Sequence, residues 1–95
     1  VMEYNAPATG EKYRNIAKAM GVDGVDSMTL DEARKAAVDA VKKLSKDVGI
    51  PTKCDKILAS DLDNLATDAL HDACYPGNPK EASHDDVVNL FKKLM

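Results

Sequence analysis

The chain has 95 residues, of which 44% are hydrophobic and 31% charged, and its net charge is -3. This length fits one modest domain. Because acidic and basic residues are spread along the whole chain, no patch indicates a nucleic-acid or membrane partner. No apolar run approaches the roughly 20 residues that cross a bilayer. Two cysteines, Cys54 and Cys74, are too few for a disulfide framework, so we expect a reduced, cytoplasmic setting.

The first predicted helix covers residues 10–20. We expect Thr9 to cap its start and Gly21 to end it. A loop rich in Gly and Asp follows. One helical stripe is formed by the apolar positions i, i+3, i+4 and i+7, which are Tyr13, Ile16, Ala17 and Met20.

The second predicted helix gives the clearest pattern in the sequence. Thr29 and Glu32 form a capping box at its start, while Gly49 and Pro51 end it. The predicted inward stripe consists of Ala33, Ala37, Ala40, Val41, Leu44 and Val48. The side chains predicted to face away are Glu32, Arg34, Lys35, Asp39, Lys42, Lys43 and Lys46. Since Asp39 and Asp47 interrupt the lysines, we interpret that face as a solvated surface.

The residues that follow are predicted to form a turn with a short helix over 53–58. Ser60 is expected to cap a further helix that runs to Cys74. Its apolar face is predicted to consist of Leu62, Leu65, Ala66, Ala69, Leu70 and Ala73.

A turn over residues 75–82 separates this helix from the last one, which Ser83 is expected to cap together with Asp86. The apolar positions of the last helix are Val87, Leu90, Phe91 and Leu94. The chain is therefore predicted to be all-α, with four substantial helices, one short helix and no strand.

Cysteine and histidine side chains are the first candidates for chemistry. His71 and Cys74 stand three residues apart and could share a metal or a proton on one helical turn. Zinc needs three or four ligands, however, and only His84 and scattered carboxylates remain. The alternative is that His71 lies near the solvent at a helix end and that Cys74 packs at the helix terminus.

A Cys–His nucleophile pair is the other catalytic possibility. Such a pair needs an oriented base and an oxyanion donor in a cleft, which a few Ala-rich helices hardly provide. His84, beside Asp85 and Asp86, is interpreted as a solvated helix start. The five glycines stand singly, so no glycine-rich phosphate loop is present.

Three stretches together resemble the C-terminal part of the iron-containing alcohol dehydrogenases. They are "VMEYNAPATGEKYRNIAKAMG", "MTLDEARKAAVDAVKKLSKDVGIPTK" and "DNLATDALHDACYPGNPKEASHDDVVNLFKKLM". The most specific elements are "VMEYN", "DVGIP" and the turn "CYPGNP". The similarity is greatest to the branch of lactaldehyde/propanediol oxidoreductase, 1,3-propanediol dehydrogenase and butanol dehydrogenase. It implies the fold of the C-terminal domain shared with dehydroquinate synthase-like proteins, a helical bundle of which residues 1–95 are the last part.

The resemblance also implies what this segment lacks. In the family, an N-terminal α/β domain binds NAD or NADP, and upstream helices hold iron, or zinc, through one Asp and three His. None of these ligands maps onto this sequence, so we expect no metal-binding, cofactor-binding or catalytic residue here. Cys74 matches a cysteine that lines the substrate cavity. Lys80 replaces the family's usual Arg after "GNP", and Cys54 stands where relatives carry Leu and is expected to pack.

The parent enzyme implied by the resemblance transfers a hydride between a nicotinamide and an alcohol carbon. We expect its remaining part to be the partner of this segment, in a homodimer or higher oligomer, and the segment alone to be inactive. Apolar faces including parts of Val1, Met2, Tyr4 and Ile16 should then be exposed and favour dimerisation. A free-standing helical interaction module is the alternative. The start "VMEYN" favours the fragment, because a module is expected to start with a cap or a tail.

Overall fold

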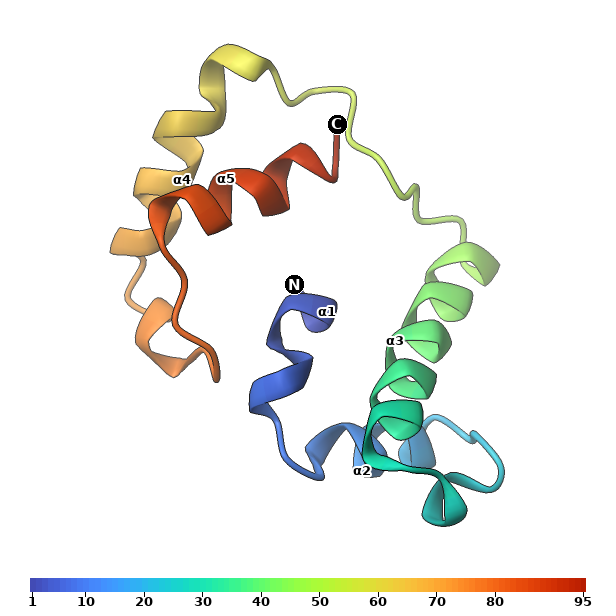
Figure 1. The fold of residues 1–95 in the computed structure, drawn as a ribbon. Coiled ribbons are helices and arrows are strands. Elements are labelled where there is room, and N and C mark those ends of the chain that lie inside the picture. The colour runs from blue at the N-terminus through green and yellow to red at the C-terminus, as the bar shows by residue number, and fades with distance from the viewer. The chain divides into compact units, whose positions relative to one another are not determined.

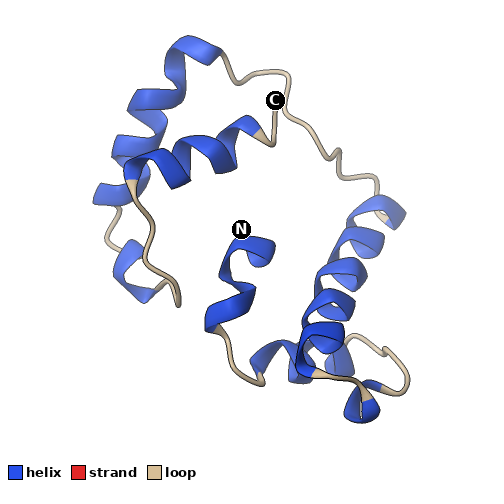
Figure 2. Ribbon diagram, viewed as in Figure 1, coloured by secondary structure: helices blue, strands red, loops and turns tan.

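The computed structural model describes residues 1–95 and consists of helices, turns and loops, without a strand (Figures 1 and 2). The prediction of an all-α chain is confirmed. The chain divides into two compact units, Val1–Ile50 and Pro51–Met95. The α-helices are α1 (Met2–Asn5), α2 (Lys12–Ala19), α3 (Leu30–Asp47), α4 (Leu62–His71) and α5 (His84–Lys92).

Four short 3₁₀ helices complete the structure. They are η1 (Ala6–Ala8), η2 (Val25–Ser27), η3 (Ala59–Asp61) and η4 (Tyr75–Gly77). The four longer α-helices lie where the sequence pattern predicts them. The short helix predicted over 53–58 is wrong, because that segment forms turns and its Cys54 N–H is bonded to the Leu94 carbonyl at 2.5 Å. The short helix of the structure is α1 instead. No helix is both long and apolar enough to span a bilayer.

Both ends of α3 follow the sequence prediction. The Thr29 hydroxyl accepts a hydrogen bond from the Glu32 N–H at 3.2 Å, and the Glu32 carboxylate accepts one from the Thr29 N–H at 3.3 Å. At the other end, Gly49 adopts φ 83°, and the Ile50 N–H donates to the Ser45 carbonyl at 2.8 Å. A glycine in the left-handed region lets the chain turn back and satisfy the last carbonyls, so the helix ends there.

Two predicted caps are wrong. The Thr9 hydroxyl donates to the Ala6 carbonyl at 2.8 Å and so serves η1, leaving α2 without a side-chain cap. Ser60 lies inside η3, and Asp61 is the residue before α4. In both places a preceding 3₁₀ turn shifts the start of the helix. The capping box predicted for Ser83 and Asp86 at the start of α5 is confirmed.

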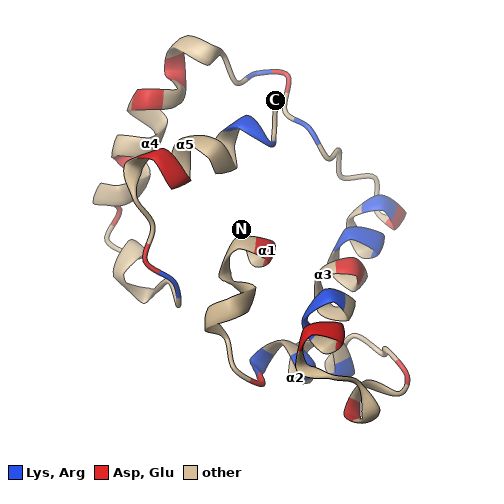
Figure 3. Cartoon of the chain, viewed as in Figure 1, with Lys and Arg blue, Asp and Glu red and all other residues tan.

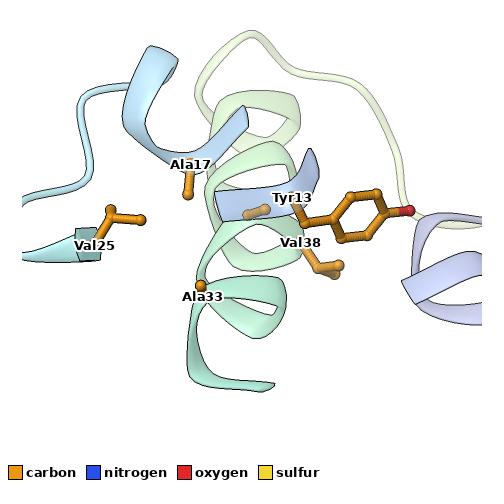
Figure 4. Packing of buried hydrophobic residues seen from close by; sticks show 6 residues of the cluster. Tyr13, Ala17, Val25, Ala33 and Val38 are labelled. Carbon is orange, nitrogen blue, oxygen red and sulfur yellow. The ribbon is translucent and has the colours of Figure 1, made fainter. Parts of the chain in front are cut away.

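The core of the first unit is formed where α2 packs against the first half of α3 (Figure 4). Three alanines, Ala17, Ala33 and Ala37, are 0% exposed. Small side chains allow two helix backbones to approach closely, so this contact depends on shape as much as on apolar area. The buried members of the cluster are Tyr13, Ala17, Val25, Ala33, Ala37 and Val38.

The inward stripe predicted for α3 is right only in its first half. Ala33 and Ala37 are buried, but Leu44 and Val48 are 53% and 63% exposed, and Val38 is buried in their place. The reason is length, since α2 has eight residues and α3 has eighteen. α2 therefore leaves the second half of α3 uncovered, where an ion pair joins Lys42 to Glu3 of α1.

An apolar groove marks that uncovered region. It has a volume of about 620 Å³ and is lined by Met20, Gly21, Val22, Ala36, Asp39, Ala40, Lys43, Leu44 and Asp47. Of the apolar residues expected to be exposed, Val1 and Ile16 are 75% and 37% exposed. Met2 and Tyr4 are half-buried. The dimerisation expected from these faces stays a prediction.

Charged residues of both signs alternate along α3 (Figure 3). Six of the seven side chains predicted to face away are exposed. Arg34 is the exception, with a side chain only 15% exposed and a guanidinium that donates to the Gly10 carbonyl at 3.3 Å. Its long stem lies against the protein while part of its head reaches backbone oxygen, so the outward prediction is wrong for this residue.

The second unit is held by the contact between α4 and α5. Its buried apolar residues are Leu62, Ala66 and Val87. Leu62 and Ala66 belong to the face predicted for α4, and Val87 to the face predicted for α5. Ala73, which was also predicted for the apolar face, is exposed because α4 ends two residues before it.

Tyr13 should make the first unit sensitive to alkaline pH. Its side chain is 6% exposed, and its hydroxyl donates to the Met2 carbonyl at 2.8 Å. Burial raises the pKa of Tyr13 above its ordinary value of 10.0. The stability that depends on the neutral phenol is therefore complete below the ordinary pKa and is lost as pH rises through the raised one. The variant Tyr13→Phe should lose about 1 kcal/mol at neutral pH and decline less steeply at alkaline pH.

Chemical denaturation monitored at a series of pH values up to about 11 measures this difference. Lys42 also contributes to the pH dependence of stability, because the hydrogen bond and charge of Glu3 raise its pKa. Its alkaline contribution should be the same in both proteins. Parallel stability curves for the wild type and Tyr13→Phe would contradict the assignment to Tyr13.

Candidate functional site

Cys74 lies just beyond the end of α4, on an exposed turn. The helix ends at His71, and the carboxylate of Asp72 then accepts a hydrogen bond from the Cys74 N–H at 2.8 Å. Side chains of Asp commonly bond the backbone two residues later and so imitate a turn. This bond fixes the backbone of Cys74 from the α4 side.

Cys74 lines a shallow surface depression of about 570 Å³, and we refer to it as the Cys74 depression. Its walls are Ala69, Asp72, Cys74, Tyr75, Gly77, Asn78 and Pro79. The lining combines a thiol, an amide, a carboxylate and apolar surface, and it includes no cationic side chain. Such a lining can contact a short alkyl chain and accept hydrogen bonds from hydroxyl groups.

The loop between α4 and α5 is fixed by Tyr75. Its hydroxyl donates to the Ala82 carbonyl at 3.0 Å and accepts from the Ala82 N–H at 3.0 Å. The amide of Asn78 donates to the Lys80 carbonyl at 2.5 Å. Within η4, the Gly77 N–H donates to the Cys74 carbonyl at 3.1 Å. Residues 75–82 are thus a closed, hydrogen-bonded loop and form one side of the depression.

The structure separates His71 from Cys74. His71 is the last residue of α4, whereas Cys74 is the residue before η4, so the two do not share a helical turn. The exposed His71 agrees with the helix-end interpretation, but Cys74 is also exposed and is not packed at the helix terminus as that interpretation expected. No group of three or more His, Cys, Asp or Glu side chains is placed to hold one metal ion.

His84 has a structural role that the sequence did not predict. It is the first residue of α5, as expected, but its Nε2 lies 3.2 Å from both the carbonyl oxygen and the carboxylate of Asp63 in α4. The Thr67 hydroxyl, 3.4 Å from the same nitrogen, donates to the Asp63 carbonyl. Because the Asp63 oxygens only accept hydrogen bonds, Nε2 must carry the hydrogen. His84 therefore joins α5 to α4, while its side chain, at the helix start where a solvated position was expected, is still 37% exposed.

The two other positions singled out by the resemblance have simpler surroundings. Lys80 is half-buried, and its carbonyl accepts the bond from Asn78 described above. Cys54 is half-buried, which fits a packing role better than an accessible thiol. Sequence reasoning missed the contribution of Asp72 and Tyr75, although an Asp two residues before a proline-containing turn is a recognisable turn signal.

Comparison with known proteins identifies the family. The family model described as "Fe-containing alcohol dehydrogenase family, C-terminal" matches residues 1–95. Lactaldehyde reductase of Escherichia coli is 52% identical over 93 residues, which cover 96% of this chain. Choline dehydrogenase of Bacillus subtilis is 34% identical and 1,3-propanediol dehydrogenase of Klebsiella pneumoniae 33% identical, each over 98% of this chain.

The match covers only part of these relatives. The chain spans 24% of the length of the lactaldehyde reductase, 23% of the choline dehydrogenase and 24% of the 1,3-propanediol dehydrogenase. The whole length of this chain is nevertheless covered by the family model, in agreement with the helical fold. The chain therefore belongs to the Fe-containing alcohol dehydrogenase family, of which it matches the C-terminal part.

Proposed function

We propose that the chain is the C-terminal helical segment of an iron-dependent, NAD(P)-linked alcohol dehydrogenase that interconverts short-chain alcohols or diols and aldehydes. The observation that carries this proposal is the family match over residues 1–95. The relatives are named for lactaldehyde, choline and 1,3-propanediol, which are all small molecules with an alcohol or aldehyde group. The family match favours this hypothesis over an interaction module.

The metal and the nicotinamide belong, in this proposal, to the rest of the parent enzyme. No three potential ligands converge in this chain, so its residues do not fit an iron site, and we assign none of them to metal or cofactor binding. The segment completes the helical domain of a cytoplasmic enzyme that forms a homodimer or higher oligomer. The apolar groove beside the second half of α3 supports this role, because it leaves surface for further contacts.

Cys74 is proposed as a wall residue of the substrate cleft. Its thiol is exposed in a depression whose other walls suit a short polar molecule. A thiol is small and weakly polar, so it can contact an alkyl chain without demanding a strong hydrogen bond. Its proposed contribution is to bind and orient substrate, not to react with it.

Turnover by the complete enzyme tests the reaction. The enzyme that carries this segment should be prepared with iron and assayed for reduction of lactaldehyde with NADH or NADPH and for oxidation of propane-1,2-diol with NAD or NADP. Absorbance of the reduced nicotinamide measures both directions. We expect turnover with at least one nicotinamide. Absence of turnover with lactaldehyde, choline and both propanediols would overturn the proposal.

Thiol labelling tests the place of Cys74. In an enzyme with Cys54→Ser, Cys74 is the one thiol of this segment, and its rate of alkylation can be followed by peptide mass spectrometry. The diol substrate should slow alkylation of Cys74 severalfold. The matched variant Cys74→Ser retains Cys54, whose alkylation should be the same with and without diol. Unchanged labelling of Cys74 in the presence of saturating diol would contradict its assignment to the cleft wall.

A further inference from the structure

The Tyr75 hydroxyl makes an unusual pair of contacts. It both donates to and accepts from the backbone of one residue, Ala82, with each distance 3.0 Å. The hydroxyl thus satisfies the backbone N–H and carbonyl of Ala82, which in a helix or strand would be paired with other backbone groups. Tyr75 and Ala82 lie on either side of the turn that holds Gly77 and Asn78. This side chain therefore joins the two ends of the segment 75–82 within the loop between α4 and α5.

This closure bears directly on Cys74. The residue is fixed on its N-terminal side by the Asp72 carboxylate and on its C-terminal side by the covalent bond to Tyr75. Its carbonyl also accepts from Gly77 inside the closed loop. The location of the Cys74 thiol therefore follows from that of its backbone. We propose that Tyr75 is a positioning residue, whose hydroxyl fixes Cys74 against the substrate in the proposed alcohol dehydrogenase.

The proposal rests on the assignment of Cys74 to the substrate cleft, and it adds that the Tyr75 hydroxyl determines the position of Cys74 there. In Tyr75→Phe the ring fills the same space, but the two backbone groups of Ala82 lose their partner. The loop can then open and take new water contacts, and the backbone beside Cys74 adopts several positions. Misplacement of a binding wall weakens substrate affinity, whereas groups elsewhere in the parent enzyme that carry out the reaction stay in place.

A double-mutant cycle in the complete enzyme tests this role. KM and kcat for propane-1,2-diol should be measured for the wild type, Tyr75→Phe, Cys74→Ala and the double variant. We expect Tyr75→Phe to raise KM about fivefold with kcat within about twofold, in line with the loss of one or two hydrogen bonds. In the Cys74→Ala background the same change should have little effect, because the thiol that it positions is already gone.

Tyr13→Phe is the matched control. It removes a tyrosine hydroxyl that also donates to a backbone carbonyl, but Tyr13 belongs to the first unit and is not a lining residue of the depression. Its KM should equal that of the wild type. A shared increase in both Tyr→Phe variants would mean general destabilisation and would overturn the positioning role.

The remaining outcomes separate the two proposals. If Cys74→Ala raises KM but Tyr75→Phe does not, or if Tyr75→Phe raises KM equally in both backgrounds, the role of Tyr75 is overturned while the cleft assignment stands. If neither variant changes KM, both the cleft assignment and the positioning role fail. An enzyme without any alcohol turnover would overturn the proposed function at the earlier step.

Discussion

Replacement of Ala37 by leucine is expected to lower the free energy of unfolding of the first unit by about 2 to 3 kcal/mol. Ala37 is 0% exposed at the contact between α2 and α3, where Ala17 and Ala33 are equally buried. Three further carbon atoms have no space there, so either the helices separate or side chains leave their preferred rotamers. Because a chain of this size is only marginally stable, such a loss is a large part of the total.

Ala40→Leu on the same helix is the matched control. Ala40 is half-buried and lines the apolar groove, which has space for a longer side chain. Alanine and leucine have similar helix propensities, so the two variants differ mainly in their surroundings. Denaturant unfolding should place Ala40→Leu within about 0.5 kcal/mol of the wild type. Equal losses in both variants would show that the close approach of α2 and α3 is not what limits the side chain at position 37.

Local signals in the sequence were sufficient for the boundaries of the best-defined helices. The capping boxes of Thr29 with Glu32 and of Ser83 with Asp86 formed as predicted, because every group involved lies within four residues. Gly49 ended α3 for the same reason. The caps assigned to Thr9 and Ser60 failed where 3₁₀ turns precede the helix. Such turns lack the periodic apolar pattern that identifies an α-helix.

Contacts between distant residues could not be predicted from spacing. The stripe on α3 correctly includes Ala33 and Ala37, but periodicity cannot say that the eight residues of α2 cover only half of it. The contact of His84 with Asp63 likewise depends on how α5 packs on α4. A pattern records which face of a helix is apolar, whereas burial depends on the length and position of its partner.

In the candidate site, too, local features could be predicted from the sequence and longer-range contacts could not. Cys74 was identified by resemblance to a family, and its role in the substrate cleft stays a prediction. Its exposure and the depression around it result from the end of α4 at His71, three residues before the predicted end. The hydrogen bonds of Asp72 and Tyr75 join residues two and seven positions apart. The shorter contact is a known turn signal, but the longer one has no sequence pattern of its own.

Loss of the Arg14 guanidinium is expected to destabilise the first unit by about 2 kcal/mol. Arg14 is 17% exposed and donates from Nη1 to the carbonyls of Val25 and Met28, at 2.5 and 2.8 Å. These bonds hold the loop of η2 against α2, where Val25 is 3% exposed in the core. The variant Arg14→Met keeps most of the stem but leaves both carbonyls without their charged donor. Denaturant unfolding measures the loss, and faster hydrogen exchange at the Met28 amide would locate it in the loop.

Two further variants separate the bonds to the loop from the ion pair with Glu11. The Glu11 carboxylate lies 2.6 Å from Arg14 Nε but is 65% exposed, so Glu11→Gln should cost less than about 1 kcal/mol. Arg14→Lys supplies a single ammonium that cannot reproduce the geometry of the guanidinium, and it should fall between the wild type and Arg14→Met. If Glu11→Gln lost as much stability as Arg14→Met, the ion pair and not the loop carbonyls would be the important contact. Normal protection of the Met28 amide in Arg14→Met would also contradict the role of the loop carbonyls, because the loop would then be held by its own packing around Val25.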